Sequence, residues 1–278
     1  MIALATCAEL PTGYLEEELA ERLGATWAVW DDPAVDWAAF SLVVVRSAWD
    51  YQTDPDAFLE WARVVPRLVN PAGVVEWNAD KRYLETVAEA GLPVVETLFL
   101  DPGDALPLGL PEEVVLKPTA SAGSRDTGRF CVAEDRAALE VLLADIHASG
   151  RTAMLQPFLP SVDTLGESAL LYADGAFSHA VRKGAILQRG EVASLATDGD
   201  PDIWPLEPSA AERALADRTV VWLQELLGPL AYARVDLLAG PDGTPIILEL
   251  ELVEPCLYLP FAPGAAERFA DALRAAAG

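Results

Sequence analysis

A charged hairpin near the end of the chain is the feature that most restricts the fold. Arg234 and Asp236 lie two residues apart and precede a Gly-Pro-Asp-Gly turn at 240–243. Glu249 and Glu251 follow that turn with the same spacing. Because side chains alternate faces along a strand, each pair shares one face, and a tight turn can bring the two faces to the same side of a sheet. The sequence therefore predicts a β-hairpin that gathers one guanidinium and three carboxylates on a rigid patch.

The residues that alternate with these charges are apolar, and they predict a sheet packed from behind by Val235, Leu237, Leu248 and Leu250. Carboxylates held this close repel one another unless a cation neutralises them. A hard divalent cation does so with oxygen ligands, and Mg²⁺ usually brings substrate phosphates with it. The hairpin leaves two interpretations open, a metal site and an acidic strand face exposed to solvent.

The chain is strongly acidic, with 44 Asp and Glu residues against 19 Lys and Arg residues and a formal net charge of −25. A field of that sign repels nucleic acids and anionic membranes, so we expect neither as a partner. No apolar segment approaches the ~20 residues of a membrane-spanning helix, and the start of the chain lacks the basic residues of a signal peptide. We therefore expect a cytoplasmic protein. Three scattered cysteines and two histidines predict neither a disulfide framework nor a histidine-based zinc site.

The chain contains three lysines, and each lies in a segment with other signs of a binding site. In so acidic a protein, a site for an anionic nucleotide has to concentrate its few cations. Lys117 lies in a predicted strand at 114–118, and the small, hydroxylated segment 119–128 follows it. Such a segment lets backbone N–H groups approach phosphate oxygens, although it matches neither a Walker A loop nor a dinucleotide fingerprint. Lys81 and Lys183 complete the set.

The first part of the chain alternates strands with helices, which is typical of an open parallel α/β sheet. The predicted strands are 2–5, 26–30, 42–45 and 68–69, and the predicted helices are 15–23 and 55–65. Such sheets bind ligands at the carboxyl ends of their strands, so the loop 46–51 is a candidate substrate site. Arg46 suits paired hydrogen bonds to a substrate carboxylate, with Trp49 and Tyr51 as walls. Two alternatives stay open: the aromatic residues fill a domain interface, or Arg46 pairs with Asp50 and fixes the loop.

The later part of the chain mixes helices with short strands. The predicted helices are 79–90 (with Asn78 as its N-cap), 137–148, 209–227 and 265–275. The predicted strands are 154–158 and a hairpin of 168–172 and 176–181. Glu167 precedes this hairpin, and Arg182 and Lys183 follow it. The segment 187–207 has no clear period, and we expect it to be a loop near the site.

The order of these features resembles the ATP-grasp superfamily, in which two α+β lobes grip ATP between them. From about Asn78 onward the order is a lysine before a helix, a strand-end lysine, a small-residue loop, Gln-Pro-Phe-Leu, an acidic residue, a basic pair, Arg-x-Asp and Glu-x-Glu. The resemblance implies an N-terminal α/β domain at 1–76 and a two-lobed ATP-grasp domain at 77–278. The lobes would be a lid at about 113–160 and a C-terminal lobe at about 161–278.

Within the superfamily the chain is most similar to the O-ureidoserine cyclo-ligases of cycloserine biosynthesis. The motifs that carry this likeness are Thr-Cys-Ala-Glu at 6–9, Trp-Asp-Asp-Pro at 30–33, Val-Arg-Ser-Ala-Trp-Asp-Tyr at 45–51, Arg-Lys-Gly-Ala at 182–185 and Leu-Glu-Leu-Glu-Leu-Val-Glu-Pro at 248–255. Prokaryotic glutathione synthetase and the RimK-like ligases are more distant relatives.

The resemblance also implies roles for individual residues. Lys81 and Lys117 would contact ATP phosphates. The rest of the ATP site would be a lid of Ser121, Ala122, Gly123 and Ser124, an adenine pocket of Gln156, Phe158 and Leu159, and Glu167 on the ribose. One or two Mg²⁺ ions would be held by Asp236, Glu249 and Glu251. The catalytic cations would be Arg234, Arg182 and Lys183. We expect substrate contacts from Arg46, Trp49, Asp50, Tyr51 and Glu254.

The expected function is that of an ATP- and Mg-dependent, ADP-forming ligase or cyclo-ligase. It would activate a small amino-acid-like substrate through an acyl-phosphate-type intermediate and then close a ring or form a C–N bond. A carboxylate–amine ligase with a dipeptide-like product is one alternative, and a non-catalytic ATP-binding regulatory protein is another, because fold alone does not prove turnover. The sequence does not name the substrate, and it leaves the oligomeric state open, with a homodimer as one option.

Overall fold

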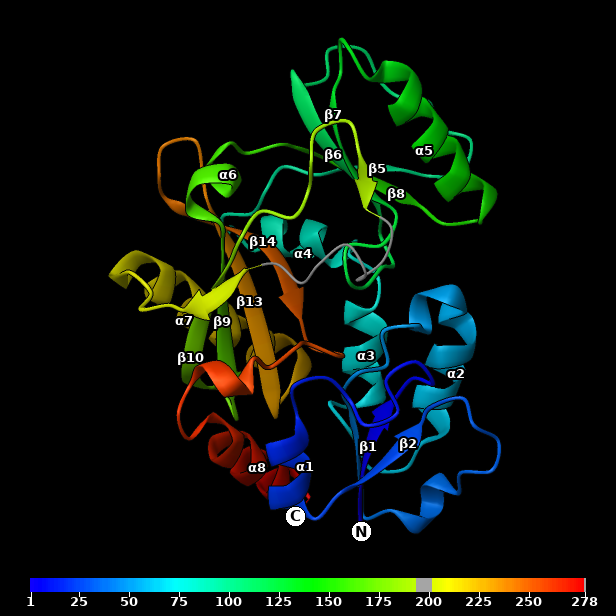
Figure 1. Cartoon of the computed structure of the whole chain (residues 1–278), viewed down its shortest axis with the longest axis vertical. Coiled ribbons are helices and arrows are strands. Elements are labelled where there is room, and N and C mark those ends of the chain that lie inside the picture. The colour runs from blue at the N-terminus through cyan, green and yellow to red at the C-terminus, as the bar shows by residue number, and fades with distance from the viewer. Residues whose placement is uncertain (194–201, 278) are drawn as a thin grey trace.

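The computed structural model describes residues 1–193 and 202–277, and three β-sheets organise this part of the chain. Figure 1 shows the first sheet at the lower right, a second sheet with long strands at the left, and a third at the top beside α5 (Arg136–Ala148). Every helix in the described ranges is too short or too polar to cross a membrane.

The first sheet confirms the predicted parallel α/β arrangement. Its strands are β1 (Ile2–Thr6), β2 (Thr26–Val29), β3 (Leu42–Val45) and β4 (Leu68–Val69), paired in parallel in the order β2-β1-β3-β4. Its helices are α1 (Glu17–Leu23) and α2 (Pro55–Val64). Asp54 caps α2 by accepting a hydrogen bond from the Ala57 amide at 3.1 Å. Because β1 and β3 are parallel neighbours, the loops that follow them meet at one edge, where Cys7 N–H donates to the Ser47 carbonyl.

The predicted helix at 79–90 is wrong at its start. The structure has α3 (Ala72–Asn78), a turn, and then α4 (Tyr83–Glu89). Asn78 does not cap a helix, because its side chain donates to the Leu250 carbonyl at 2.8 Å and accepts from the Leu252 amide at 2.7 Å. These two bonds satisfy backbone groups at the end of a distant strand. Lys81 consequently lies in the turn between two helices.

The third sheet is antiparallel and carries the predicted strand-end lysine. Its strands are β5 (Leu98–Leu100), β6 (Glu113–Pro118), β7 (Thr127–Cys131), β8 (Ala153–Pro157) and β11 (Val192–Ala193), in the order β11-β7-β6-β8-β5. Helix α5 covers it with an apolar face of Leu139, Leu142, Leu143 and Ile146. These residues recur at helical spacing, which explains why the sequence predicted α5 almost to the residue.

The second sheet contains both predicted hairpins. Its strands are β9 (Glu167–Ala173), β10 (Ala176–Lys183), β12 (Ile203–Pro205), β13 (Tyr232–Ala239) and β14 (Pro245–Glu251), in the order β12-β10-β9-β13-β14. Helix α7 (Ala210–Leu227) packs against it, and α6 (Ser161–Leu165) precedes β9. The predicted loop at 187–207 is wrong in part, because β11 and β12 pair with neighbouring sheets there. Residues 194–201 of that segment lie outside the described residues.

The charged hairpin forms as predicted, with one irregularity. Arg234 lies opposite Glu251 and Asp236 lies opposite Glu249, so all four charged side chains share one side of the sheet. The register shifts just after Asp236. Such a bulge sets two residues of one strand against one of the other. Leu248 therefore packs with a small apolar cluster on the charged side, and the expectation that it lies behind the sheet is wrong.

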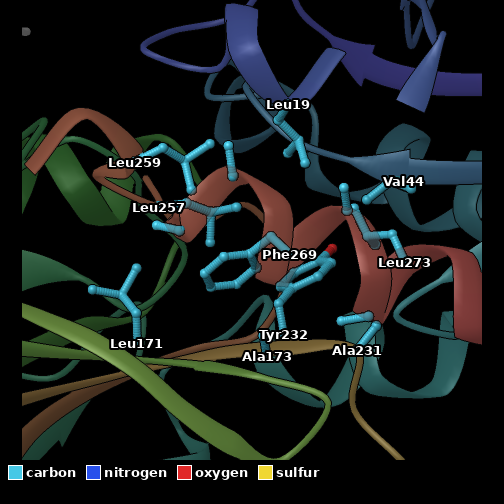
Figure 2. Packing of buried hydrophobic residues seen from close by; sticks show 14 of the residues in the cluster. Leu19, Val44, Leu171, Ala173, Ala231, Tyr232, Leu257, Leu259, Phe269 and Leu273 are labelled. Carbon is cyan, nitrogen blue, oxygen red and sulfur yellow. The ribbon is translucent and has the colours of Figure 1, made fainter. Parts of the chain in front are cut away.

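A shared core joins the first and second sheets. Helix α8 (Ala265–Ala276) lies beside α1 at the bottom of Figure 1 and contacts β9 and β10. Figure 2 shows Phe269 of α8 next to Tyr232 of β13, with Leu19 and Val44 reaching them from the N-terminal part. All four side chains are fully buried. The two sheets are therefore held together by close-packed apolar side chains, which fixes the geometry of the space between them.

Candidate active site

A cavity of about 330 Å³ is lined by elements of the second and third sheets and by the loops that follow β1 and β3. Its size lies at the lower end of the range for small-molecule sites. Lys117 reaches it from β6, Lys183 from β10, Asp236 from β13 and Glu249 from β14. Charged groups from strands far apart in the sequence thus converge on one space.

The cavity brings together all but three of the residues predicted for the site. The three that do not line it are Arg46, Asp50 and Arg182. The predicted residues that do line it are Trp49, Tyr51, Lys81, Lys117, Ser121, Ala122, Gly123, Ser124, Gln156, Phe158, Leu159, Glu167, Lys183, Arg234, Asp236, Glu249, Glu251 and Glu254.

Two lysines form ion pairs with one carboxylate at the edge of the hairpin. Lys81 Nζ lies 3.1 Å from Glu249 Oε1, and Lys117 Nζ lies 3.3 Å from Glu249 Oε2. Burial alone would raise the pKa of Glu249, but the charges of Lys81 and Lys117 outweigh it and lower that pKa to about 2. Lys81 Nζ also donates to the Ser121 carbonyl at 2.7 Å, so this cluster is tied to the small-residue loop.

A second cluster surrounds Asp236. Arg234 donates to both of its oxygens, from Nε and from Nη2, each at 2.8 Å. Lys183 Nζ donates to Asp236 Oδ2 at 2.9 Å and also contacts Glu167. Burial opposes ionisation, but the neighbouring Arg234 and Lys183 charges dominate and hold the pKa of Asp236 well below its usual range. Arg234 further contacts Glu251. Asp236 therefore stays ionised.

Arg182 and Lys183 illustrate why adjacency in sequence does not give adjacency in space. They are consecutive on β10, so their side chains point to opposite faces of the sheet. Lys183 faces the cavity, whereas Arg182 donates from Nη1 to the Leu165 carbonyl at 2.9 Å. Its Nη2 lies 3.6 Å from Glu212 Oε1 on α7. The structure thus separates the predicted basic pair.

Arg46 and Asp50 lie behind the cavity wall. Arg46 donates to Glu16, not to Asp50, and its guanidinium lies 4.9 Å from the ring centre of Tyr232. Asp50 Oδ1 accepts a hydrogen bond from Trp30 Nε1 at 2.7 Å. Both side chains brace the loop after β3, and this loop turns Trp49 and Tyr51 toward the cavity.

Tyr14 and Tyr258 are among the lining residues that the sequence did not assign to the site. Tyr14 follows β1, at the same carboxyl edge as the loop after β3, and its ring lies 5.3 Å from that of Trp49. The strand-edge rule that selected the second loop could have selected the first. Cys256 is nearly buried, and burial raises the pKa of its thiol to about 12, so it is not a reactive thiolate.

The donors in the cavity suit a hard cation, because carboxylate oxygens are the ligands that Mg²⁺ prefers. Within residues 1–193 and 202–277, no three Asp, Glu, His or Cys side chains converge closely enough to cage a metal. Asp236, Glu249 and Glu251 instead face lysine or arginine. Mg²⁺ normally uses one or two carboxylates together with phosphate oxygens and water, so the chemistry of the donor set fits an ion that arrives with a nucleotide.

Known proteins resemble this chain in both sequence and fold. Residues 2–70 match the family described as the N-terminal domain of D-cycloserine synthetase DcsG. The whole chain is 38% identical to the cycloserine biosynthesis protein DcsG of Streptomyces lavendulae, over 98% of this chain and 97% of that protein.

Solved structures give the same result. The crystal structure of D-cycloserine synthetase DcsG has a TM-score of 0.90 at 35% identity and covers 100% of this chain and 99% of its own. The D-alanine–D-alanine ligase of Bacillus anthracis in complex with ATP has a TM-score of 0.67 at 13% identity, over 99% and 96% of the two chains. The second likeness reflects a shared fold. The present chain therefore belongs to the DcsG family of ATP-grasp ligases.

Proposed function

We propose that this protein uses ATP to activate the carboxyl group of a small amino-acid-like substrate and then closes a ring within that molecule. One observation carries the proposal: a strongly acidic protein gathers all three of its lysines and Arg234 in a single cavity. Such a concentration of positive charge suits a polyanionic ligand. The similarity to D-cycloserine synthetase supports ring closure, and the resemblance to O-ureidoserine cyclo-ligases suggests O-ureidoserine as the substrate.

The ATP phosphates would bind at the two lysines that hold Glu249. Lys81 and Lys117 would exchange part of their contact with that carboxylate for phosphate oxygens, which carry more charge. Because Lys81 also holds the Ser121 carbonyl, phosphate binding would be coupled to the loop 121–124, our proposed lid. The adenine would lie against Gln156, Phe158 and Leu159, and Glu167 would bind the ribose hydroxyls. These four roles rest on the resemblance to ATP-grasp enzymes.

The chemistry follows from what a carboxylate lacks. A carboxylate is a poor electrophile because its charge is delocalised and its leaving group is oxide. Transfer of the γ-phosphoryl group to one carboxylate oxygen creates an acyl phosphate and releases ADP, and a nitrogen of the same substrate then displaces phosphate. Arg234 and Lys183 would steady the oxygens of the phosphoryl group during transfer, so that catalysis consists of positioning and electrostatics. An acyl phosphate hydrolyses readily, so the lid would exclude water.

Mg²⁺ would be held by Asp236, Glu249 and Glu251, where it would supply charge neutralisation for the phosphates. Arg234 and Lys183 already keep Asp236 ionised, so this ligand needs no change of protonation to accept the ion. We further propose that residues 1–76 form the N-terminal domain and 77–278 the ATP-grasp domain. The lobe that carries the lid loop 121–124 would span about 113–160. The consumption of ATP would place the reaction in the cytoplasm.

A screen tests the proposal. Purified protein with Mg-ATP is offered amino acids and ureido-amino acids in turn, and phosphate release is recorded for each. We expect release with O-ureidoserine without any added amine. Thermal melts run alongside should show strong stabilisation by Mg-ATP and weak stabilisation by Mg²⁺ alone. An unchanged melting temperature at saturating Mg-ATP would remove the nucleotide site, and release that requires a second amine would replace ring closure by intermolecular ligation.

A further inference from the structure

Part of the cavity wall combines one carboxylate with several aromatic rings. Glu254 lines the cavity together with Tyr14, Trp49, Tyr51 and Tyr258. Glu254 and Tyr51 line the same cavity, and after burial the charge of Glu254 is the largest influence that raises the pKa of Tyr51. A carboxylate among aromatic faces is a poor place for an anion and a favourable one for an organic cation.

The carboxylate of Glu254 differs from its neighbours because no Lys or Arg in residues 1–193 and 202–277 forms an ion pair with it. Lys81 and Lys117 neutralise Glu249. Arg234 and Lys183 form ion pairs with the other acids of the cavity. Those acids are Asp236, Glu251 and Glu167. The Glu254 carboxylate makes no hydrogen bond or ion pair with any residue that the structure describes. Burial, followed by the nearby charge of Glu251, raises the pKa of Glu254 to about 8, as expected for an acid that lacks a partner.

The backbone around Glu254 is held by three separate donors. Trp49 Nε1 donates to the Glu254 carbonyl at 3.1 Å, and Arg46 Nη2 donates to the Pro255 carbonyl. Arg234 Nη1 donates to the Cys256 carbonyl at 3.2 Å. Three successive carbonyls thus accept side-chain donors from the loop after β3 and from β13, which holds the backbone that carries the Glu254 side chain. A ligand that pairs with this carboxylate meets a side chain that projects from a backbone already held in place.

We infer that Glu254 receives the ammonium group of the amino-acid-like substrate, with Trp49 and Arg46 as positioning residues. This inference rests on the proposed function and adds the orientation of the substrate. The ammonium end would lie at Glu254 among the aromatic rings, and the carboxyl group to be activated would face Arg234 and Lys183. Charge complementarity then rejects acids that lack the ammonium group, because the partly buried carboxylate would be left unpaired.

The test compares two ligands on two proteins. The ligands are O-ureidoserine and its desamino analogue, 3-(ureidooxy)propanoate, which keeps the carboxyl and ureido groups. The proteins are the wild type and Glu254→Gln, with Glu60→Gln as a matched control on an exposed face of α2. KM is taken from phosphate release at saturating Mg-ATP. Kd is taken from calorimetric titration in the presence of a non-hydrolysable ATP analogue.

We expect loss of the ammonium group to raise KM and Kd by about 10- to 100-fold in wild type and in Glu60→Gln, the range for a charge-assisted contact. In Glu254→Gln the two ligands should differ little, with KM for ATP unchanged. Equal use of both ligands by wild type would overturn the inference without any variant, as would full discrimination in Glu254→Gln. Wild type that releases no phosphate with O-ureidoserine would overturn the proposed function, and this inference with it.

Discussion

Arg46 donates two hydrogen bonds to a single oxygen of Glu16, from Nε at 2.9 Å and from Nη2 at 2.7 Å. The two side chains are 0% and 2% exposed, so the pair is closed off from water. It joins the start of the loop after β3 to the residue that precedes α1. Arg46 therefore acts as an internal anchor. To bind a substrate carboxylate, as its position in the sequence suggested, Arg46 would have to leave its buried partner Glu16.

Removal of one member of this pair should destabilise the fold. Arg46→Met leaves the Glu16 carboxylate buried without a cation, which costs about 3–5 kcal/mol. The double replacement Arg46→Met with Glu16→Leu should recover much of that loss, because no charge is then left unpaired. Urea unfolding of the two single variants and the double variant measures this coupling. Equal stability of Arg46→Met and wild type would contradict the anchor role.

Glu249→Gln should abolish phosphate release while the protein still folds. The substitution keeps the shape of the side chain but removes a proposed metal ligand and the partner of Lys81 and Lys117. The folded pKa of Glu249 lies near 2, below its usual 4.5. The contacts of ionised Glu249 with the two lysines therefore stabilise the wild type fully above about pH 4.5, and this stabilisation is lost as the pH falls toward 2. The variant should therefore lose less stability on acidification, as followed by thermal melts from pH 6 to pH 3. Near-normal turnover by a folded variant would refute the proposed role.

Lys117→Ala should weaken ATP binding by about 1.5–3 kcal/mol, the size of a hydrogen bond to a charged group. Arg218→Ala on the exposed side of α7 is the matched control, since it removes a cation that does not line the cavity. Calorimetric titration with Mg-ATP gives both affinities. If the two isotherms overlay, Lys117 has no special part in nucleotide binding.

The opposite faces of β10 give a paired comparison. Lys183→Met should lower kcat for phosphate release by at least ten-fold, because it removes a cation next to Asp236. Arg182→Met should leave kcat within about two-fold of wild type and reduce stability only slightly, since its contact with Glu212 is long and partly exposed. Both variants are assayed at saturating substrate and by thermal melts. A larger loss of kcat in Arg182→Met than in Lys183→Met would reverse the assignment.

Local patterns in the sequence predicted the elements that are built from local contacts. The parallel strands of the first sheet, the hairpin of β9 and β10, and helix α5 all follow from periodicity and turn residues. The charged hairpin was predicted for the same reason, since its turn and its alternation lie within 231–251. The convergence of lysines from three segments was inferred from composition and the family resemblance together.

The features that the sequence did not reveal depend on residues far apart in the chain. Asn78 lies at the end of a helix, where its side-chain amide forms hydrogen bonds with the backbone of Leu250 and Leu252, more than 170 residues later. Glu16 was not anticipated as the partner of Arg46, since nothing near either residue marks the other. The bulge after Asp236 places Leu248 in one apolar cluster with Leu238, whereas a strict two-residue alternation would put Leu248 on the opposite face from Glu249. Long-range partners of this kind are invisible to local pattern.

The stoichiometry of products shows whether ATP drives ring closure within one substrate. Wild-type protein is incubated with Mg-ATP and O-ureidoserine, without any other amine, and ADP, phosphate and the cyclised product are quantified over time. We predict that one ring product accumulates for each ADP and each phosphate formed, and that Glu249→Gln yields none of the three. Release of ADP and phosphate with no cyclised product, or no release at all from a protein that binds Mg-ATP, would rule out ATP-driven ring closure of O-ureidoserine by this protein.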